Sequence, residues 1–389
     1  MTRPVDTWLL PDGVADVLPA EAARLEALRR RLLDRFAAWG YQLVFPPLME
    51  YLESLLTGSG HDLELMTFKI TDQLTGRMMG VRADITPQVA RLDAHCLPVD
   101  GPARYCYAGT TLNTRPAGLA ASRCPVQIGA ELYGYEGVAG DIEILRLMLE
   151  TLALAGCGEL HLDLGHVGLF GGLARHAGLA PDDERRLFDI YQRKAAAELR
   201  EFLAAHPLPD GLAARFEGLL RLAGPASVLA DARALLAGTS ADIDAALDAL
   251  DAVAAALAAS HPGVTLYFDL TELRGYHYHT GLVFAAYTPG ARSELAKGGR
   301  YDHVGEAFGR ARPATGFSAD LKTLLAYFAD AEARTPVLAP AGDDAALREA
   351  IALLREAGEC VRQLLPGEAM PAAGRRLAQA DGRWTVLPS

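Results

Sequence analysis

The pattern of apolar and polar positions predicts a chain of short strands framed and interrupted by helices. Leu25, Leu28, Leu32 and Phe36 recur every three or four residues, which predicts a helix that Pro19 opens and Gly40 ends. An extended segment broken by two prolines follows at 41–49. Alternating stretches predict strands at 66–70, 77–82, 104–108, 126–134, 160–164, 264–270 and 280–287. Because no helical crossovers separate most of them, we expect an antiparallel sheet rather than a doubly wound parallel one.

Shifts in residue type divide the chain further. Residues from about 176 to 260 are rich in Ala, Leu and Arg at helical spacing, and we interpret them as a helical insertion that serves as scaffold. Residues 335–344 are rich in Pro, Gly and Asp and are interpreted as a linker, followed by a helix at 345–357. The pattern therefore predicts an α+β core domain at 1–330 and a linker with a short C-terminal remnant domain at 331–389.

Composition narrows the class of protein. Half of the 389 residues are hydrophobic and 22% are charged, so a folded core is expected. The net charge of −12 disfavours a large nucleic-acid footprint. The five cysteines show no CxxC spacing, so we expect neither a disulfide framework nor a structural zinc site. The chain starts without a signal-peptide pattern and contains no long apolar stretch, so we expect no membrane span and a cytoplasmic location.

Two clusters place carboxylates among apolar neighbours. In VRADITPQ, Asp84 and Thr86 fall on one face of an extended segment, where they can hold an ammonium group together. The alternative is a helix start with Thr86 as N-cap and Pro87 in the first turn, and both can hold at once. In QIGAELYG, Gln127 and Glu131 share a strand face, and Glu131 needs either a ligand or a core arginine as partner.

A third cluster, ELRGYHYHTG, combines Arg274 with aromatic and imidazole side chains. Such a stretch can clamp a carboxylate with Arg274 and a flat ring with its aromatics. Alternation places Tyr276 and Tyr278 on one face, with His277 and His279 on the other. The two histidines lack further ligands at metal spacing, so we expect no metal site. Phosphate-cradling glycine patterns are absent as well, and no cofactor is predicted.

Taken in order, these stretches resemble the class II histidyl-tRNA synthetase family over about residues 10–330. GYQLVFPPLME resembles the first, dimer-forming motif, QIGAELYG the second, RGYHYHTG the histidine-specific segment, and GGRYD with ATGF the approach to the third. The resemblance implies that fold, with an antiparallel sheet flanked by helices. It also implies a histidine site, whose residues would be Asp84, Thr86, Gln127, Glu131, Arg274, Tyr278 and His279. His279 stands where the family has a second tyrosine.

The departures from that family concern ATP. Amino-acid activation needs cations on the ATP phosphates, because negative charge builds up in the transition state. The resemblance puts Leu112 and Thr114 at an arginine and a glutamate of the second motif, and Thr323 at the arginine of the third. Arg115, the residue after Thr114, is the alternative source of the positive charge that Leu112 lacks. The tail is also about half as long as a complete anticodon-binding domain. Activation is therefore not expected.

With a histidine pocket kept and these charges lost, the chain resembles the family of ATP phosphoribosyltransferase regulatory subunits, also in the details YHYHTGLVFAAY and GRARPATGFSADLK. This implies a non-catalytic chain with no catalytic residues of its own. It further implies a short catalytic subunit as partner, a hetero-octamer of four plus four chains, a dimer of this chain, and L-histidine as feedback effector in the first step of histidine biosynthesis. No tRNA partner is expected. The alternatives are an active histidyl-tRNA synthetase, a paralog that activates another amino acid, and a module that senses uncharged tRNA.

Overall fold

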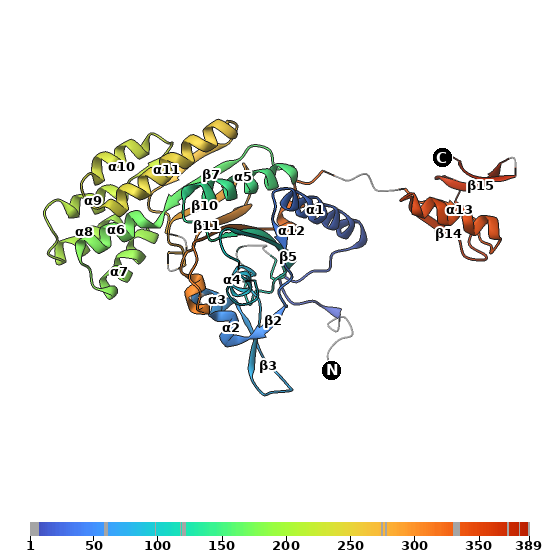
Figure 1. Cartoon of the computed structure of the whole chain (residues 1–389), viewed down its shortest axis with the longest axis horizontal. Helices are drawn as coiled ribbons and strands as arrows, with labels where there is room; N and C mark the ends of the chain where they lie inside the picture. The colour runs from blue at the N-terminus through green and yellow to red at the C-terminus, as the bar shows by residue number, and fades with distance from the viewer. Residues whose placement is uncertain are drawn as a thin grey trace. The chain divides into compact units, whose positions relative to one another are not determined.

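The computed structural model describes residues 8–57, 61–97, 99–116, 118, 122–273, 275–276, 278–329, 335–371, 373–380 and 382–387. The chain forms two compact units, Met1–Ala329 and Asp330–Ser389, and each is described by itself. Figure 1 shows both, with the helices and strands labelled.

A nine-stranded sheet forms the centre of the first unit. Its order is β1-β5-β6-β12-β11-β10-β7-β9-β8. The strands are β1 (Gln42–Leu43), β5 (Ala103–Thr110), β6 (Val126–Tyr133), β7 (His161–His166), β8 (Ala223–Gly224), β9 (Thr265–Asp269), β10 (Leu282–Tyr287), β11 (Ala296–Arg300) and β12 (Ala314–Asp320). The central pairs are antiparallel, which agrees with the predicted class. Two pairs nearer the edges, β1–β5 and β7–β9, are parallel, which the sequence pattern did not indicate.

Helices cover the two faces of this sheet differently. The amphipathic helix α1 (Pro19–Ala38) buries Leu28, Leu32 and Phe36 beside α5 (Val138–Leu154) on one face (Figure 1). The opposite face is covered by α4 (Thr86–His95), the 3-10 helix η2 (Val304–Phe308) and a smaller, tyrosine-rich core. The helix predicted from Pro19 is confirmed, and Gly40 after it has a φ of 84°. The short helix α12 (Leu321–Leu324) follows β12.

The predicted insertion is helical, and its first helix begins at Val167, before the expected start at about residue 176. It consists of α6 (Val167–Ala177), α7 (Pro181–Gln192), α8 (Ala196–Ala205), α9 (Leu212–Leu219), α10 (Val228–Leu236) and α11 (Ala241–Ser260), gathered at the β7–β10 side of the sheet (Figure 1). The pattern missed the two-residue strand β8, which lies between α9 and α10 and pairs with β9. A strand this short carries too few alternating positions to give a periodic signal.

A small sheet of order β2-β4-β3 directly precedes the segment that contains Asp84 and Thr86. It contains β2 (Met49–Tyr51), β3 (Phe68–Thr71) and β4 (Met78–Val81), with the short helices α2 (Leu52–Leu56) and α3 (His61–Met66) beside it. The strand predicted at 66–70 therefore starts two residues later, because Met66 still belongs to α3. Arg82 follows β4 and donates to the carbonyl oxygens of Pro46 and Thr110, which ties this small sheet to the end of β5.

The second unit is a four-stranded sheet with one helix. Its order is β14-β13-β15-β16, from β13 (Val337–Ala339), β14 (Val361–Gln363), β15 (Arg376–Ala380) and β16 (Arg383–Leu387), and α13 (Ala345–Glu356) packs on it. The helix expected at 345–357 is confirmed, with Asp344 as its N-cap. The linker expected at 335–344 is wrong in part, because β13 lies within it and is buried. In the part of the chain that is described, no helix is long and apolar enough to cross a membrane.

Candidate functional site

Strands β5 and β6 bring a set of polar side chains to the sheet face that α4 covers. Residues at even spacing share a face, so Gln127 and Glu131 of β6 point the same way. The register pairs Tyr105 of β5 with Glu131, which places Tyr105 and Tyr107 beside them. The other face of β6 instead presents Ile128, Ala130 and Leu132 to the core under α1 and α5. Alternation along two strands therefore builds a polar cluster into a buried surface.

Glu131 is held by hydroxyl groups on three sides. It is 1% exposed. Thr86 Oγ1 donates to its Oε1 at 3.1 Å and Tyr107 Oη to the same atom at 3.0 Å, while Tyr301 Oη donates to Oε2. Burial raises the pKa of Glu131 to about 8, although the hydroxyl donors act in the opposite direction. Among the described residues the carboxyl group has no arginine partner, so the interpretation as a core salt bridge is wrong.

Two glycines make room for this arrangement. A Cβ on Gly316 of β12 would lie 1.6 Å from Glu131 Oε2, and the register pairs these two residues across the strands. A Cβ on Gly129 would lie 2.4 Å from Tyr107 Oη. Both side chains thus lean over a neighbouring strand at positions where only a hydrogen fits.

Asp84 and Gln127 form the next part of the site. Gln127 Nε2 donates to Asp84 Oδ1 at 2.8 Å, and its Oε1 accepts from Ile85 N at 2.9 Å. Asp84 Oδ1 also accepts from Thr86 N at 3.0 Å. Thr86 is the first residue of α4, and the cap position belongs to Ile85, so the prediction of Thr86 as N-cap is wrong. Its hydroxyl is instead free to turn to Glu131, because Asp84 satisfies the first helical amide.

Tyr278 and His279 reach the cluster through Tyr301. The Tyr278 ring stacks on that of Tyr301 with centroids 5.1 Å apart, and the His279 ring meets Tyr278 edge-on at 5.3 Å. The Tyr278 hydroxyl is buried and has no hydrogen-bond partner among the described residues. A buried hydroxyl of this kind beside a carboxylate suits a ligand that both donates and accepts. Arg274, the remaining predicted member of the site, lies outside the described residues.

The alternation predicted for this segment is wrong for Tyr276 and Tyr278, and His277 lies outside the described residues. Residues 275–276 and 278–280 form a turn, in which the amides of Tyr278 and His279 both donate to Gly275 O, at 2.7 and 2.8 Å. Tyr276 therefore does not share a face with Tyr278. It packs against Phe170 and Phe188 in the helical insertion. A left-handed glycine, with a φ of 66° at Gly275, breaks the period of two on which the prediction rested.

The structure thus brings together six of the seven predicted residues, Asp84, Thr86, Gln127, Glu131, Tyr278 and His279, in one chain of contacts. Sequence reasoning missed Tyr107 and Tyr301, which supply two of the three hydroxyl donors. Tyr107 follows Tyr105 by two positions in a predicted strand, so the period of two could have placed both side chains on one face. Tyr301 lies in GGRYD after β11, and only the fold brings it to a residue 170 positions away.

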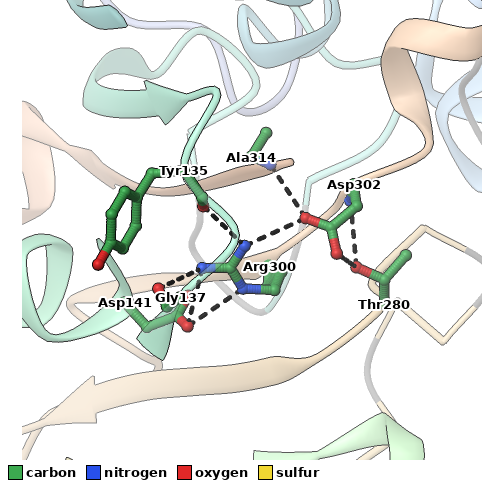
Figure 2. A network of polar contacts seen from close by, with 7 residues as sticks. All are labelled: Tyr135, Gly137, Asp141, Thr280, Arg300, Asp302 and Ala314. Atoms are coloured by element: carbon green, nitrogen blue, oxygen red, sulfur yellow. Dashed lines mark hydrogen bonds and ion pairs between the residues drawn. The ribbon is translucent and has the colours of Figure 1, made fainter. Parts of the chain in front are cut away.

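A second polar network borders the same turn (Figure 2). Arg300 forms a buried ion pair with Asp141, with Nη2 3.0 Å from Oδ2, and donates to the carbonyl oxygens of Tyr135 and Gly137. Its Nη1 also lies 3.2 Å from Asp302 Oδ1. Asp302 accepts from the hydroxyl of Thr280 at 2.7 Å. The network joins the start of β10 to the ends of β6 and β11.

The positions that concern ATP carry neutral side chains with partners of their own. The amide of Leu112 donates to Arg82 O at 3.0 Å. Thr114 Oγ1 donates to Leu65 O at 2.7 Å, and Thr323 Oγ1 donates to Asp320 Oδ2 at 3.1 Å. Arg115 is exposed.

The described residues also line two surface hollows to which the cluster contributes no side chain. One of about 170 Å³ is lined by Pro102, Arg104, Leu132, Tyr135, Ala139, Gly140 and Glu143, and one of about 190 Å³ lies in the second unit between α13 and β15–β16. Among the described residues no group of three His, Cys, Asp or Glu side chains could hold a metal ion. We place the site at the Glu131 cluster, because the first hollow is lined chiefly by apolar atoms and its Arg104 and Glu143 are already paired.

Two sequence profiles of known protein families match this chain. A sequence profile described as histidyl-tRNA synthetase matches residues 13–324. A second, described as the C-terminal domain of the ATP phosphoribosyltransferase subunit HisZ, matches residues 334–387. A protein of Thioalkalivibrio sulfidiphilus named ATP phosphoribosyltransferase regulatory subunit is 55% identical over 386 residues, which cover 97% of this chain and 98% of that protein.

Solved structures give the same fold. A crystal structure described as an ATP phosphoribosyltransferase regulatory subunit/histidyl-tRNA synthetase from Bacillus halodurans superposes with a TM-score of 0.80 at 27% identity, covering 94% of each chain. A chain of the ATP phosphoribosyl transferase (HisG:HisZ) complex from Thermotoga maritima has a TM-score of 0.58 at 18% identity, over 76% of this chain and 96% of that one. The predicted fold class is thereby confirmed.

The curated relatives are named as regulatory subunits, which confirms the expectation of a regulatory rather than a catalytic chain. The match to such relatives over nearly the whole length, and not only over the synthetase-like part, decides between the two families that the motifs resemble. The chain belongs to the family of ATP phosphoribosyltransferase regulatory subunits.

Proposed function

We propose that this chain binds L-histidine at the Glu131 cluster and uses that binding to regulate a short catalytic subunit of ATP phosphoribosyltransferase. The catalytic subunit needs this chain for full activity, and bound histidine lowers that activity as feedback on the first step of histidine biosynthesis. The name of the Thermotoga maritima complex, which pairs HisG with HisZ, supports the partnership.

The observation that carries the proposal is a difference between two parts of a synthetase-like site. Side chains suited to an amino acid are present, whereas the charged side chains that ATP would need are replaced by neutral ones. Six side chains suited to an amino acid lie in one cluster around Glu131. Asp84 and Thr86 suit the ammonium group, while Glu131 and the unpaired hydroxyl of Tyr278 suit the imidazole. Arg274 is proposed for the carboxylate. Leu112, Thr114 and Thr323 carry no charge where ATP would need it.

To reach Glu131, histidine must displace some of the hydroxyl groups that hydrogen-bond to it. The Glu131 carboxyl group already accepts from Thr86, Tyr107 and Tyr301. Exchange of a hydroxyl donor for an imidazole N–H conserves the hydrogen bond, so the rearrangement does not leave the buried carboxyl group unsatisfied.

The test combines activity with binding. The catalytic subunit is assayed alone and with this chain, and histidine is then titrated into the assay and into a calorimeter cell that holds the chain. We expect activation by the chain, inhibition by histidine, and loss of inhibition in Glu131→Gln. Exposed Glu201→Gln is the matched control, and it should behave as the unaltered chain. No change in activity on addition of the chain would contradict the proposal.

Three rival functions can be distinguished by simpler assays. An active synthetase would catalyse histidine-dependent exchange of pyrophosphate into ATP, and a paralog for another amino acid would bind that amino acid more tightly than histidine. A sensor of uncharged tRNA would retain tRNA in a filter-binding assay at moderate salt. We expect a negative result in each case.

Assembly forms the last part of the proposal. We propose a dimer of this chain through the region around β1, where Leu43, Phe45, Leu48 and Met49 are exposed, and a cytoplasmic hetero-octamer of four plus four subunits. We also propose that residues 1–330, with the insertion at about 176–260, and residues 331–389 act as separate domains, which the two compact units support.

A further inference from the structure

The turn of residues 275–276 and 278–280 carries Tyr278 and His279 into the proposed histidine site, and two anchors outside that site hold it. The turn closes on Gly275, whose carbonyl accepts from the amides of both residues. It belongs to no strand of the sheet. Its position therefore depends on the contacts that its two ends make.

The anchor at the C-terminal end is the Arg300 network (Figure 2). Thr280 N donates to Arg300 O at 2.8 Å, and Thr280 Oγ1 donates to Asp302. Asp302 in turn accepts from Ala314 N at 3.0 Å, so the end of the turn is fixed to β11 and β12. This anchor belongs to the sheet.

The anchor at the N-terminal end belongs to the helical insertion. The Tyr276 ring lies against Phe170 of α6 and Phe188 of α7, with centroids 5.2 and 5.3 Å apart. Its hydroxyl donates to Glu184 Oε1 of α7 at 2.7 Å. A Cβ on Gly171 of α6 would lie 3.1 Å from that hydroxyl, so the glycine leaves the space that the tyrosine fills. Aromatic contacts and one charge-assisted hydrogen bond thus hold the ring in place.

We propose that Tyr276 and Glu184 are positioning residues for the histidine site, so that the helical insertion sets the affinity of the site although it supplies no group that touches the ligand. The inference rests on the proposed function. Tyr278 lies two positions after Tyr276, and this length of chain spans at most about 7 Å. A displacement of Tyr276 is therefore passed on to Tyr278, whose ring stacks on Tyr301 beside Glu131. Groups that contact a ligand lose affinity when the residues that orient them are lost.

The hydrogen bond between Tyr276 and Glu184 gives a direct test. Tyr276→Phe removes the donor and keeps the ring, and Glu184→Ala removes the acceptor. Glu184→Gln keeps an acceptor oxygen and should restore the contact. Histidine affinity is measured by calorimetry on the full chain. Amide hydrogen exchange of residues 275–280 is measured without histidine.

We expect Tyr276→Phe and Glu184→Ala each to weaken histidine binding about fivefold, which matches the usual contribution of one hydrogen bond. Both should speed the exchange of the Tyr278 and His279 amides. The double variant should be no weaker than either single one, because both remove the same contact. Glu184→Gln should lie close to the unaltered chain. A purely structural role would lower the unfolding midpoint and leave the affinity unchanged.

Two controls make the same chemical changes at exposed positions. Tyr267→Phe removes an exposed tyrosine hydroxyl on β9, and Glu198→Ala removes an exposed carboxylate of the insertion that pairs with Arg193. Neither should change affinity or exchange. Unchanged exchange in Tyr276→Phe and Glu184→Ala would overturn the inference. If the unaltered chain binds no histidine, the proposed function fails instead, and the exchange data still decide whether the insertion positions the turn.

Discussion

At the scale of single residues, Glu131 combines deep burial with hydroxyl partners instead of a cation. Burial disfavours the charged carboxylate, and this effect outweighs the three hydrogen bonds that favour it, so its pKa rises to about 8. In the unfolded chain the carboxyl group returns to its ordinary value of 4.5. Between these two pH values the folded state keeps a proton that the unfolded state has lost. Stability therefore falls as pH rises through this window and changes no further above it.

Glu131→Gln should remove that dependence. We expect the free energy of unfolding of the unaltered chain to decline relative to the variant between pH 5 and pH 8, by up to about 1.4 kcal/mol per pH unit. Above about pH 8 the difference should stay constant. Urea unfolding across this range measures it, with the exposed Glu201→Gln as control. A difference between the two proteins that does not vary with pH would show that Glu131 is ionised throughout.

At the scale of elements, the pairing of β6 with β12 depends on a glycine opposite a glutamate. A Cβ at Gly316 would lie 1.6 Å from Glu131 Oε2 and 2.8 Å from Ala130 O. We expect Gly316→Ala to destabilise the fold by about 1–3 kcal/mol, since the side chain overpacks a buried position. Urea unfolding measures the loss. Gly224→Ala on β8, where a Cβ meets nothing within 4 Å, is the control. An equal effect in both variants would mean that Glu131 has room to move.

The elements also show where sequence patterns are sufficient. Helices such as α1 and α13 were predicted because caps and apolar spacing are local signals. The strand β13 was missed because it is three residues long and lies between Pro336 and Pro340, which are typical of a linker. Tyr276 was assigned to the wrong surroundings because Gly275 turns the chain at the point where alternation was assumed.

At the scale of the whole molecule, exposed apolar side chains gather near the first motif. Phe45 is 73% exposed, and Leu43, Leu48 and Met49 of the same segment are also exposed. Large exposed apolar groups of this kind are typical of protein–protein interfaces. A dimer through this region would cover them.

Phe45→Asp should therefore weaken self-association. Because a buried charge opposes an apolar interface, we expect the dissociation constant to rise at least about 30-fold, as a loss of about 2 kcal/mol implies. Sedimentation velocity over a range of concentrations measures it. Tyr267→Asp, a change at an exposed aromatic residue of β9, should leave the constant as it was. If both proteins sediment alike, the dimer uses another surface.

The sequence by itself determined the order of the elements, the two families that the motifs resemble, and the loss of charge at Leu112, Thr114 and Thr323. These features depend on local spacing and on residue type, both of which can be read along the chain. Only the tertiary structure decided what surrounds Glu131. Tyr107 and Tyr301 reach it across 24 and 170 positions, and Tyr276 meets Glu184 across 92. Contacts between residues so far apart follow from strand register and from the docking of helices, and a local pattern carries neither.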